Sequence, residues 1–441
     1  MLRILYGTAG TGKSAAIMDE IRRGADSGER YILLVPEQYS HEAERELCAV
    51  CGDGLSLYAE VLSFTGLARE ISSECGGAAN EYLDKGGRLL CMALAADGLY
   101  SRLRVYGAAR RKAELQTMLL GAVDEFKSAC VTSERLMQAS EACEGALGDK
   151  LHDLGLILEA YDGVVANGRA DPSDRLSVLA QQIGQCSMSE RTHVFVDGFT
   201  DFTAQERRVL EALLSKGVCL TVCLGCDELH GGSEVFALSR ITASALLKFA
   251  ADNGIKAQTE RFGGESTKAK PLGEFAENMF SYRAVEAGDA QGRIKIISAA
   301  DTNAECEFAA AEAVSLVRDT GCRWRDIAVC AKGFDDYRLP LESAFSRFGA
   351  PIYTARKADM LSKPLPMLIE SAYEIILGGW EADDVFDYLR TGFGGLDTDE
   401  CDELENYVFM WQLHGSAWTR AENWRLHPEG YGKQPDEASE Q

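Results

Sequence analysis

A membrane-spanning stretch is the first feature that this sequence of 441 residues lacks. No window approaches the roughly 18 uninterrupted apolar residues that cross a bilayer as a helix. The chain also passes from Met1 directly into a short apolar strand pattern, which leaves no room for a secretory signal peptide. We therefore expect a cytoplasmic protein that has no membrane partner.

Positive charge is scarce, because 45 Lys and Arg residues face 69 Asp and Glu residues and give a formal net charge of −24. Such a balance argues against a surface generally covered by nucleic acid, although it allows a local basic groove. One segment, 98–113, departs from the trend, because it has no acid and interleaves two tyrosines with five cations. It fits either a segment that follows a phosphate backbone or a solvated helical face. Its cations are Arg102, Arg104, Arg110, Arg111 and Lys112.

Clustered cysteines are also absent. The 14 cysteines are scattered, and several lie on apolar strand patterns such as 218–223. Two C-x-x-C pairs, Cys48/Cys51 and Cys223/Cys226, lie far apart in the chain and have no histidine at ligand spacing. We interpret them as reduced, buried thiols rather than as a metal or cluster site.

The strongest motif opens the chain. A strand pattern at 1–6 is followed at once by GTAGTGKS at 7–14, which matches the phosphate-binding pattern G-x-x-x-x-G-K-[ST] in full. The glycines let the backbone bring N–H groups close to phosphate oxygens, the lysine reaches the outer phosphates, and the final hydroxyl is a Mg²⁺ ligand. Apolar residues at helical spacing follow at 15–22, so the loop leads into a helix N-terminus, which favours anions. The predicted nucleotide-binding residues, against the alternative of a simple Gly-rich turn, are Gly7, Gly10, Thr11, Gly12, Lys13 and Ser14.

The rest of the pattern predicts an α/β protein. An apolar run at 31–36 comes one helix after the first strand, which indicates a βαβ unit and a parallel sheet. Helical periodicity without strands fills about 86–183, and strand patterns resume at 193–197 and 218–224. A second α/β pattern has strands at 293–297, 326–330 and 351–354, beyond a domain link near 265–290. The predicted domain ranges are 1–85, 86–188 (a helical insertion), 189–285, 286–362 and 363–441.

Asp197 ends the strand pattern at 193–197. In a domain that opens with a phosphate-binding loop, an acid at the tip of a strand is the expected Mg²⁺ partner of Ser14. The alternative is that Asp197 is a helix cap or a turn residue.

Longer strings carry a resemblance to a family. The string DGFTDFTAQE at 197–206 and the string VPEQYS at 35–40, together with the loop at 7–14, resemble the AddB (RexB) family, the second subunit of the bacterial AddAB helicase-nuclease. The segments 150–154, 324–329, 389–393 and 404–408 are similar to that family's segments, in its order. Strings of this length discriminate among P-loop proteins where the loop alone does not.

The resemblance implies a UvrD-like, superfamily 1 helicase layout. Residues 1–85 and 189–285 would form RecA-like domain 1A, 86–188 a 1B-like insertion, 286–362 the first part of domain 2A, and 363–441 the start of a 2B-like insertion. It implies ATP, Mg²⁺ and DNA as ligands, an AddA-type helicase-nuclease subunit as partner in a heterodimer, and a role in double-strand-break resection for homologous recombination.

The resemblance also implies parts that we do not assign to this chain. Family members are longer and end in a nuclease domain that carries an iron–sulfur cluster, so we expect no nuclease activity from these residues and assign none of the cysteines to a cluster. It further places Gln38, Ser40 and Phe64 on the face that binds a DNA strand, where an aromatic ring can stack on a base. For Phe64 the alternative is a core or staple residue.

The strand-end signature departs from that of working UvrD-like motors, D-E-x-Q-D, because its second position is Gly198 and its fourth is Thr200. The missing glutamate would activate the attacking water, so we expect binding with weak or absent hydrolysis. No adenine-reading glutamine motif precedes the first strand, so base selectivity should be weak. The arginine that would close the nucleotide site from its far side has no identifiable counterpart. Two alternatives stay open: an active DNA-dependent ATPase whose base is Asp201 or Glu206, and a scaffold whose loop is a relic that serves to dock the partner.

Overall fold

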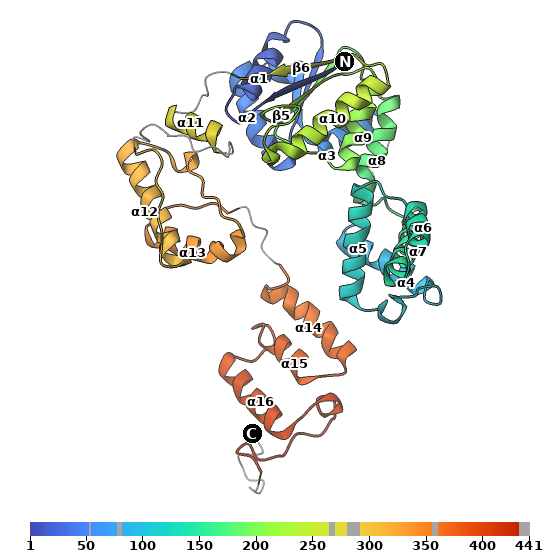
Figure 1. Cartoon of the computed structure of the whole chain (residues 1–441). Helices are drawn as coiled ribbons and strands as arrows, with labels where there is room; N and C mark the ends of the chain where they lie inside the picture. The colour runs from blue at the N-terminus through green and yellow to red at the C-terminus, as the bar shows by residue number, and fades with distance from the viewer. Residues whose placement is uncertain (53, 77–81, 264–269, 280–291, 355–359, 432–441) are drawn as a thin grey trace. The chain divides into compact units, whose positions relative to one another are not determined.

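The computed structural model describes residues 1–52, 54–76, 82–263, 270–279, 292–354 and 360–431. The chain divides into two compact units, residues 1–295 and 296–441 (Figure 1). The domain boundary predicted at 285/286 lies slightly N-terminal to this division at 295/296. Much of the link predicted at 265–290 lies outside the described residues. Among the helices that the structure describes, none has the length and apolarity needed to cross a membrane.

A sheet of six strands in the order β3-β2-β4-β5-β1-β6 organises the first unit. Every neighbouring pair is parallel, so the carboxyl ends of all the strands open onto one edge of the sheet. The α/β class and the parallel sheet predicted from the sequence are therefore confirmed. The strands are β1 (Leu2–Gly7), β2 (Arg30–Leu34), β3 (Ala59–Leu62), β4 (Thr192–Val196), β5 (Cys219–Gly225) and β6 (Ala257–Arg261).

Both faces of the sheet are covered by helices, which is why its central strands read as continuous apolar runs. One face packs against α1 (Lys13–Arg23) and α2 (Ser40–Cys51), through residues such as Leu5, Ile21 and Leu47. The other face packs against α3 (Phe64–Glu74), α8 (Arg175–Gln182), α9 (Ala204–Ser215) and α10 (Ala237–Asp252) (Figure 1).

The edge strands are harder to read from the sequence. All five residues of β6 are exposed, and their pattern AQTER has no apolar alternation, so no strand was predicted there. At the other edge, β3 begins only at Ala59, because 55–57 forms a 3₁₀ turn.

The helical insertion has its own core. It consists of α4 (Lys85–Gly98), α5 (Ala113–Ser128), α6 (Ser133–Ala142) and α7 (Ala146–Val165), which pack around residues such as Met92, Val123 and Tyr161. Helix α8 falls inside the range predicted for the insertion, 86–188, yet its Leu179 packs in the sheet core. The segment 99–112 is a loop with a 3₁₀ turn rather than a helical face.

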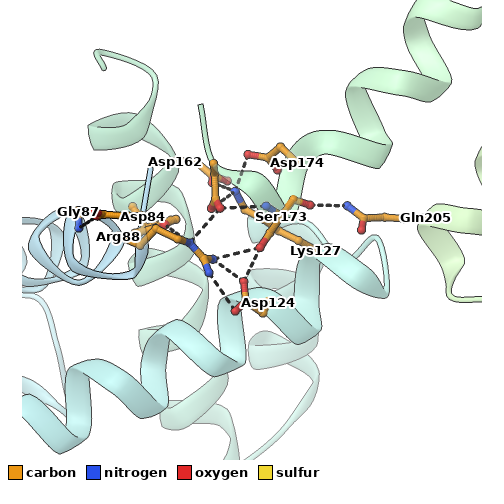
Figure 2. A network of polar contacts seen from close by, with 11 residues as sticks. Asp84, Gly87, Arg88, Asp124, Lys127, Asp162, Ser173, Asp174 and Gln205 are labelled. Atoms are coloured by element: carbon orange, nitrogen blue, oxygen red, sulfur yellow. Dashed lines mark hydrogen bonds and ion pairs between the residues drawn. The ribbon is translucent and has the colours of Figure 1, made fainter. Parts of the chain in front are cut away.

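A polar network joins the insertion to α9, a helix that packs against the sheet (Figure 2). The Lys127 ammonium on α5 lies 2.9 Å from Asp162, 3.1 Å from Asp171 and 2.7 Å from Asp174. Arg88 on α4 pairs with Asp124 and, at 3.0 Å, with Asp171. Two further hydrogen bonds connect this network to α9. The Gln205 amide on α9 donates to the Ser173 carbonyl at 2.8 Å, and the Ser173 hydroxyl donates to Asp124 at 2.5 Å.

The second unit is helical in its described residues. Its helices are α12 (Thr302–Thr320), α13 (Phe334–Arg347), α14 (Pro364–Gly378), α15 (Ala382–Leu389) and α16 (Thr398–Trp411), while α11 (Lys270–Asn278) precedes them in the first unit. The strands predicted at 293–297, 326–330 and 351–354 were wrong for this structure, which has none there. Alternating apolar residues show which side of a segment could be buried, but they do not show which strand it would pair with. In this structure Ile296 is 95% exposed, and the three segments do not pair with one another within the described ranges.

Short 3₁₀ turns connect several of these elements. Those in the described residues are η1 (Glu37–Tyr39), η2 (Leu55–Leu57), η3 (Gly107–Ala109), η4 (Pro172–Asp174), η5 (Ile183–Gln185), η6 (Glu234–Phe236), η7 (Trp324–Asp326) and η8 (Gly415–Ala417).

Candidate nucleotide site and strand-end loops

The phosphate loop, residues 7–14, lies between β1 and α1, as the sequence predicted. Gly10 and Gly12 adopt φ angles of 83° and 87°, a region that glycine enters without steric cost. Position 7 requires glycine for a different reason, because a Cβ on Gly7 would lie 2.3 Å from the Phe262 carbonyl oxygen. No side chain caps α1 and its first turn has no acid, so its N-terminal end is open to an anion. The loop geometry therefore fits a phosphate group.

Lys13 folds back over this loop. Its ammonium donates to the Gly7 carbonyl at 2.6 Å, the Thr8 carbonyl at 2.8 Å and the Thr11 hydroxyl at 3.4 Å. Burial lowers the pKa of Lys13, while the nearby Cys223 thiol and Asp197 carboxylate act in the opposite direction. The cation thus lies at the loop, held by neutral oxygens that phosphate oxygens can replace.

Asp197 lies at the same edge of the sheet. It follows β4, and a single strand, β5, separates β4 from β1. Its backbone N–H donates to the Leu34 carbonyl at 3.0 Å, and its carboxylate accepts the Gly198 N–H at 2.9 Å. Asp197 does not cap α9, because the N-cap there is Thr203. Of the alternatives for Asp197, the helix cap is therefore excluded, and its place near Lys13 leaves it available as a Mg²⁺ ligand.

Gly198 follows Asp197, at the position where the resemblance to UvrD-like motors would place a glutamate. Its φ is 82°, and an added Cβ would lie 3.2 Å from Pro36 Cδ. A side chain here would meet both a strained backbone and a neighbouring ring. Glu206, one of the two candidate bases, is engaged in a capping box: its carboxylate accepts the Thr203 N–H at 2.8 Å. Asp201 is exposed and is the less constrained of the two candidates.

The predicted DNA-contacting residues follow the neighbouring strands. Gln38 is exposed in η1, just after β2, and the Ser40 hydroxyl donates to the Glu37 carbonyl at 2.8 Å. Because β2 is parallel to β4, this segment opens onto the same edge of the sheet as Asp197. No observation tests DNA binding by these two residues, and it stays a prediction.

Phe64 is placed differently from the other two. It is only 6% exposed, and its ring meets those of Phe199 at 5.5 Å and Phe202 at 6.3 Å in edge-on contacts. In this conformation the Phe64 ring has no free face on which a base could stack. Phe64 therefore lies in the core, as the second of the two interpretations of the sequence proposed. A DNA contact by Phe64 would need the ring to leave this cluster.

Two residues at this edge of the sheet, Cys223 and Tyr39, were not predicted from the sequence as site residues. Burial raises the pKa of the Cys223 thiol, the Asp197 charge adds to the effect, and Lys13 opposes it, so both charges act on Cys223. Burial, then Glu46, then the Asp197 charge raise the pKa of Tyr39 to about 12. Tyr39 belongs to the string VPEQYS at 35–40, so the sequence could have pointed to it as a site residue. The position of Cys223 near the site follows only from the order of the strands in the sheet.

Comparison with known proteins identifies relatives over almost the whole chain. The family model described as "ADDB, N-terminal" matches residues 4–275. The B subunit of the ATP-dependent helicase/deoxyribonuclease of Acetivibrio thermocellus is 31% identical over 97% of this chain, and those of Desulforudis audaxviator and Heliobacterium modesticaldum are each 34% identical over 96%. The chain spans 36–38% of the length of these three relatives.

Proposed function

Because this chain belongs to the AddB family, we propose that it is the nucleotide- and DNA-binding part of the second subunit of a helicase-nuclease. It binds ATP·Mg²⁺ at the phosphate loop, with weak or no hydrolysis. It binds single-stranded DNA at the strand-end loops, which are the segments that follow β2 and β3 and carry Gln38, Ser40 and Phe64. Its partner is an AddA-type subunit, and the assembly resects double-strand breaks in the cytoplasm for recombinational repair. The need for a partner is supported by the relatives, which are named as one subunit of a helicase/deoxyribonuclease.

One observation carries the nucleotide half of this proposal: the open, uncapped phosphate loop with Lys13 shares a sheet edge with the Asp197 carboxylate. In this arrangement the loop N–H groups and Lys13 would hold the phosphates, and Ser14 and Asp197 would be the ligands of the metal. The bound Mg²⁺ would neutralise phosphate charge. Gly198 leaves no carboxylate beside Asp197 to orient a water, so retention of nucleotide, rather than turnover, is the expected outcome.

We expect Lys13→Ala and Ser14→Ala each to weaken ATP·Mg²⁺ binding at least tenfold, about 1.4 kcal/mol. The first removes the cation that faces the outer phosphates, and the second removes a metal ligand. Isothermal titration calorimetry measures both, with Lys248→Ala, an exposed lysine on α10, as the control for lost charge. Unchanged affinity in both variants would leave the scaffold alternative as the better description.

The unmodified chain is expected to bind nucleotide in the micromolar range yet turn over slowly with saturating single-stranded DNA. Gly198→Glu should not raise the rate, because it adds a carboxylate on a backbone that costs roughly 1–2 kcal/mol for any L side chain. Gly198→Ala is the matched control, since it introduces the same strain without a carboxylate. Steady-state ATP hydrolysis is the measurement. A rate of several per second in the unmodified chain would support the active-ATPase alternative, and Asp201→Asn would then show whether Asp201 is the base.

A further inference from the structure

The loop between α4 and α5, residues 99–112 and hereafter the basic loop, concentrates positive charge on an otherwise acidic chain. It has no acid of its own and projects large side chains into solvent, with Arg111 76% and Tyr100 58% exposed. Val105 is exposed as well. The loop is therefore a cationic surface with an accessible aromatic ring.

Its cations are only partly neutralised. Arg104 pairs with Asp149 at 2.8 Å, and Arg110 and Arg111 share Asp97 at 3.0 and 3.1 Å. Arg104 and Arg111 are exposed, and exposed pairs contribute little free energy and exchange readily for another anion, whereas the Arg110 side chain is only 17% exposed.

Two further cations of the basic loop, Arg102 and Lys112, are exposed. Their side chains form no ion pair or hydrogen bond within the described part of the chain. Their charge is thus available to an external anion without the loss of an internal contact.

A buried carboxylate holds the loop in place. Asp153 on α7 is fully buried and accepts the backbone N–H groups of Arg104 at 2.9 Å, Val105 at 2.7 Å and Tyr106 at 3.1 Å. Burial alone would raise the pKa of Asp153, but these three donors and His152 bring it below its ordinary value. The Arg110 guanidinium also stacks over Tyr100, 3.9 Å from the ring centroid. The charged side chains therefore project from an ordered backbone, which lowers the entropic cost of binding.

We propose that the basic loop is an additional DNA-binding surface, which holds the phosphate backbone through Arg102 and Lys112, with Tyr100 beside them as a ring for base stacking. The inference rests on the proposed function and extends it from the strand-end loops to the helical insertion. A chain of net charge −24 repels polyanions in general, so an ordered acid-free loop is the feature that would let one bind here. The exposed tyrosine favours DNA over an acidic polypeptide, which offers no base to stack.

The test is the salt dependence of binding to a fluorescent oligothymidylate, measured by anisotropy with the full 441-residue chain. Each phosphate contact to a single strand contributes about 0.7 to the slope of log K against log salt. Arg102→Ala/Lys112→Ala should therefore lower the slope by about 1.4 and weaken binding about 25-fold at 0.1 M salt. The matched control, Arg135→Ala/Lys248→Ala, removes the same charge from exposed positions on α6 and α10 and should leave the slope unchanged.

An unchanged slope in the loop variant, or an equal loss in the control, would overturn this inference and leave DNA binding at the strand-end loops intact. Polyglutamate that binds the loop more tightly than the oligonucleotide would overturn it in favour of an acidic protein partner. Failure of the unmodified chain to bind DNA at all would overturn the DNA half of the proposed function as well. Nucleotide binding, with its own Lys13→Ala variant, reports separately on the other half.

Discussion

Lys127→Ala is expected to lower the free energy of unfolding of the first unit by about 3–5 kcal/mol. Lys127 is only 7% exposed and is surrounded by three carboxylates, of which Asp171 is fully buried (Figure 2). Removing the cation leaves the buried Asp171 charge with Arg88 as its remaining charged partner in the network. The cost comes mainly from this uncompensated charge, not from the loss of an attractive pair.

Urea denaturation followed by circular dichroism measures this effect. Arg23→Ala is the control, because it also removes a cation from an ion pair, here with Asp19, but one at the surface, and should cost less than about 1 kcal/mol. Equal effects of the two substitutions would mean that the network contributes no more than a surface pair.

The cost of Lys127→Ala should also depend on pH. Burial raises the pKa of Asp171, but the Ser173 N–H, Lys127 and Arg88 bring it below its ordinary value. A depressed pKa contributes stability above the unfolded value, about 3.9, and that contribution is lost as the pH falls further. Once Asp171 is protonated it no longer needs a cation. The difference between variant and unmodified chain should therefore be largest near neutrality and shrink below about pH 4.

Phe64→Ala should cost a similar amount, about 3–5 kcal/mol, because it empties a packed aromatic cluster. Phe64 is the first residue of α3, directly after the Ser63 cap, and its ring lies in contact with Phe199 and Phe202. Phe199 and Phe202 belong to the segment that connects Asp197 to α9, so the cavity would open next to the candidate site.

Thermal unfolding and oligonucleotide binding, measured together, separate a core role of Phe64 from a DNA contact. Phe64→Leu keeps most of the apolar volume and should be tolerated far better than alanine in stability. If Phe64→Ala melts within a few degrees of the unmodified chain yet loses DNA affinity, the ring leaves its cluster to stack on a base, and the core description is wrong.

The sequence was sufficient where one residue pattern has one structural solution. The spacing of Gly7, Gly12 and Lys13 predicted a strand, a loop and a helix, and the loop geometry agrees. The buried strands were found because apolar residues line both of their faces. The polar strand β6 could not be found in this way, since its position follows from hydrogen bonds to β1 that leave no trace in its side chains.

Where one pattern has two solutions, the sequence could not choose between them. An aromatic residue after a strand, such as Phe64, fits a core as well as a binding face, and only the packing of Phe199 and Phe202 against it decides which it enters here. The role of Cys223 depends on the order of strands that lie far apart in the chain. The segments predicted as strands at 293–297, 326–330 and 351–354 have the apolar alternation of a strand, but in the described part of this structure they have no neighbouring strand with which to pair.

The strand order also sets the sequence of events when the chain is made. Among the described residues, strand β1 pairs with β5 and β6 alone, and the Met1 amine donates to the Val218 carbonyl, 217 positions away. At about 5–20 residues per second, the ribosome needs about 10–40 s to supply that partner. During this interval Ile4 and Leu5 are apolar residues of a nascent chain without a strand to join, and are open to capture by a chaperone. The phosphate loop is thus synthesised well before β5 and β6, the strands that pair with β1, and takes its shape only after them.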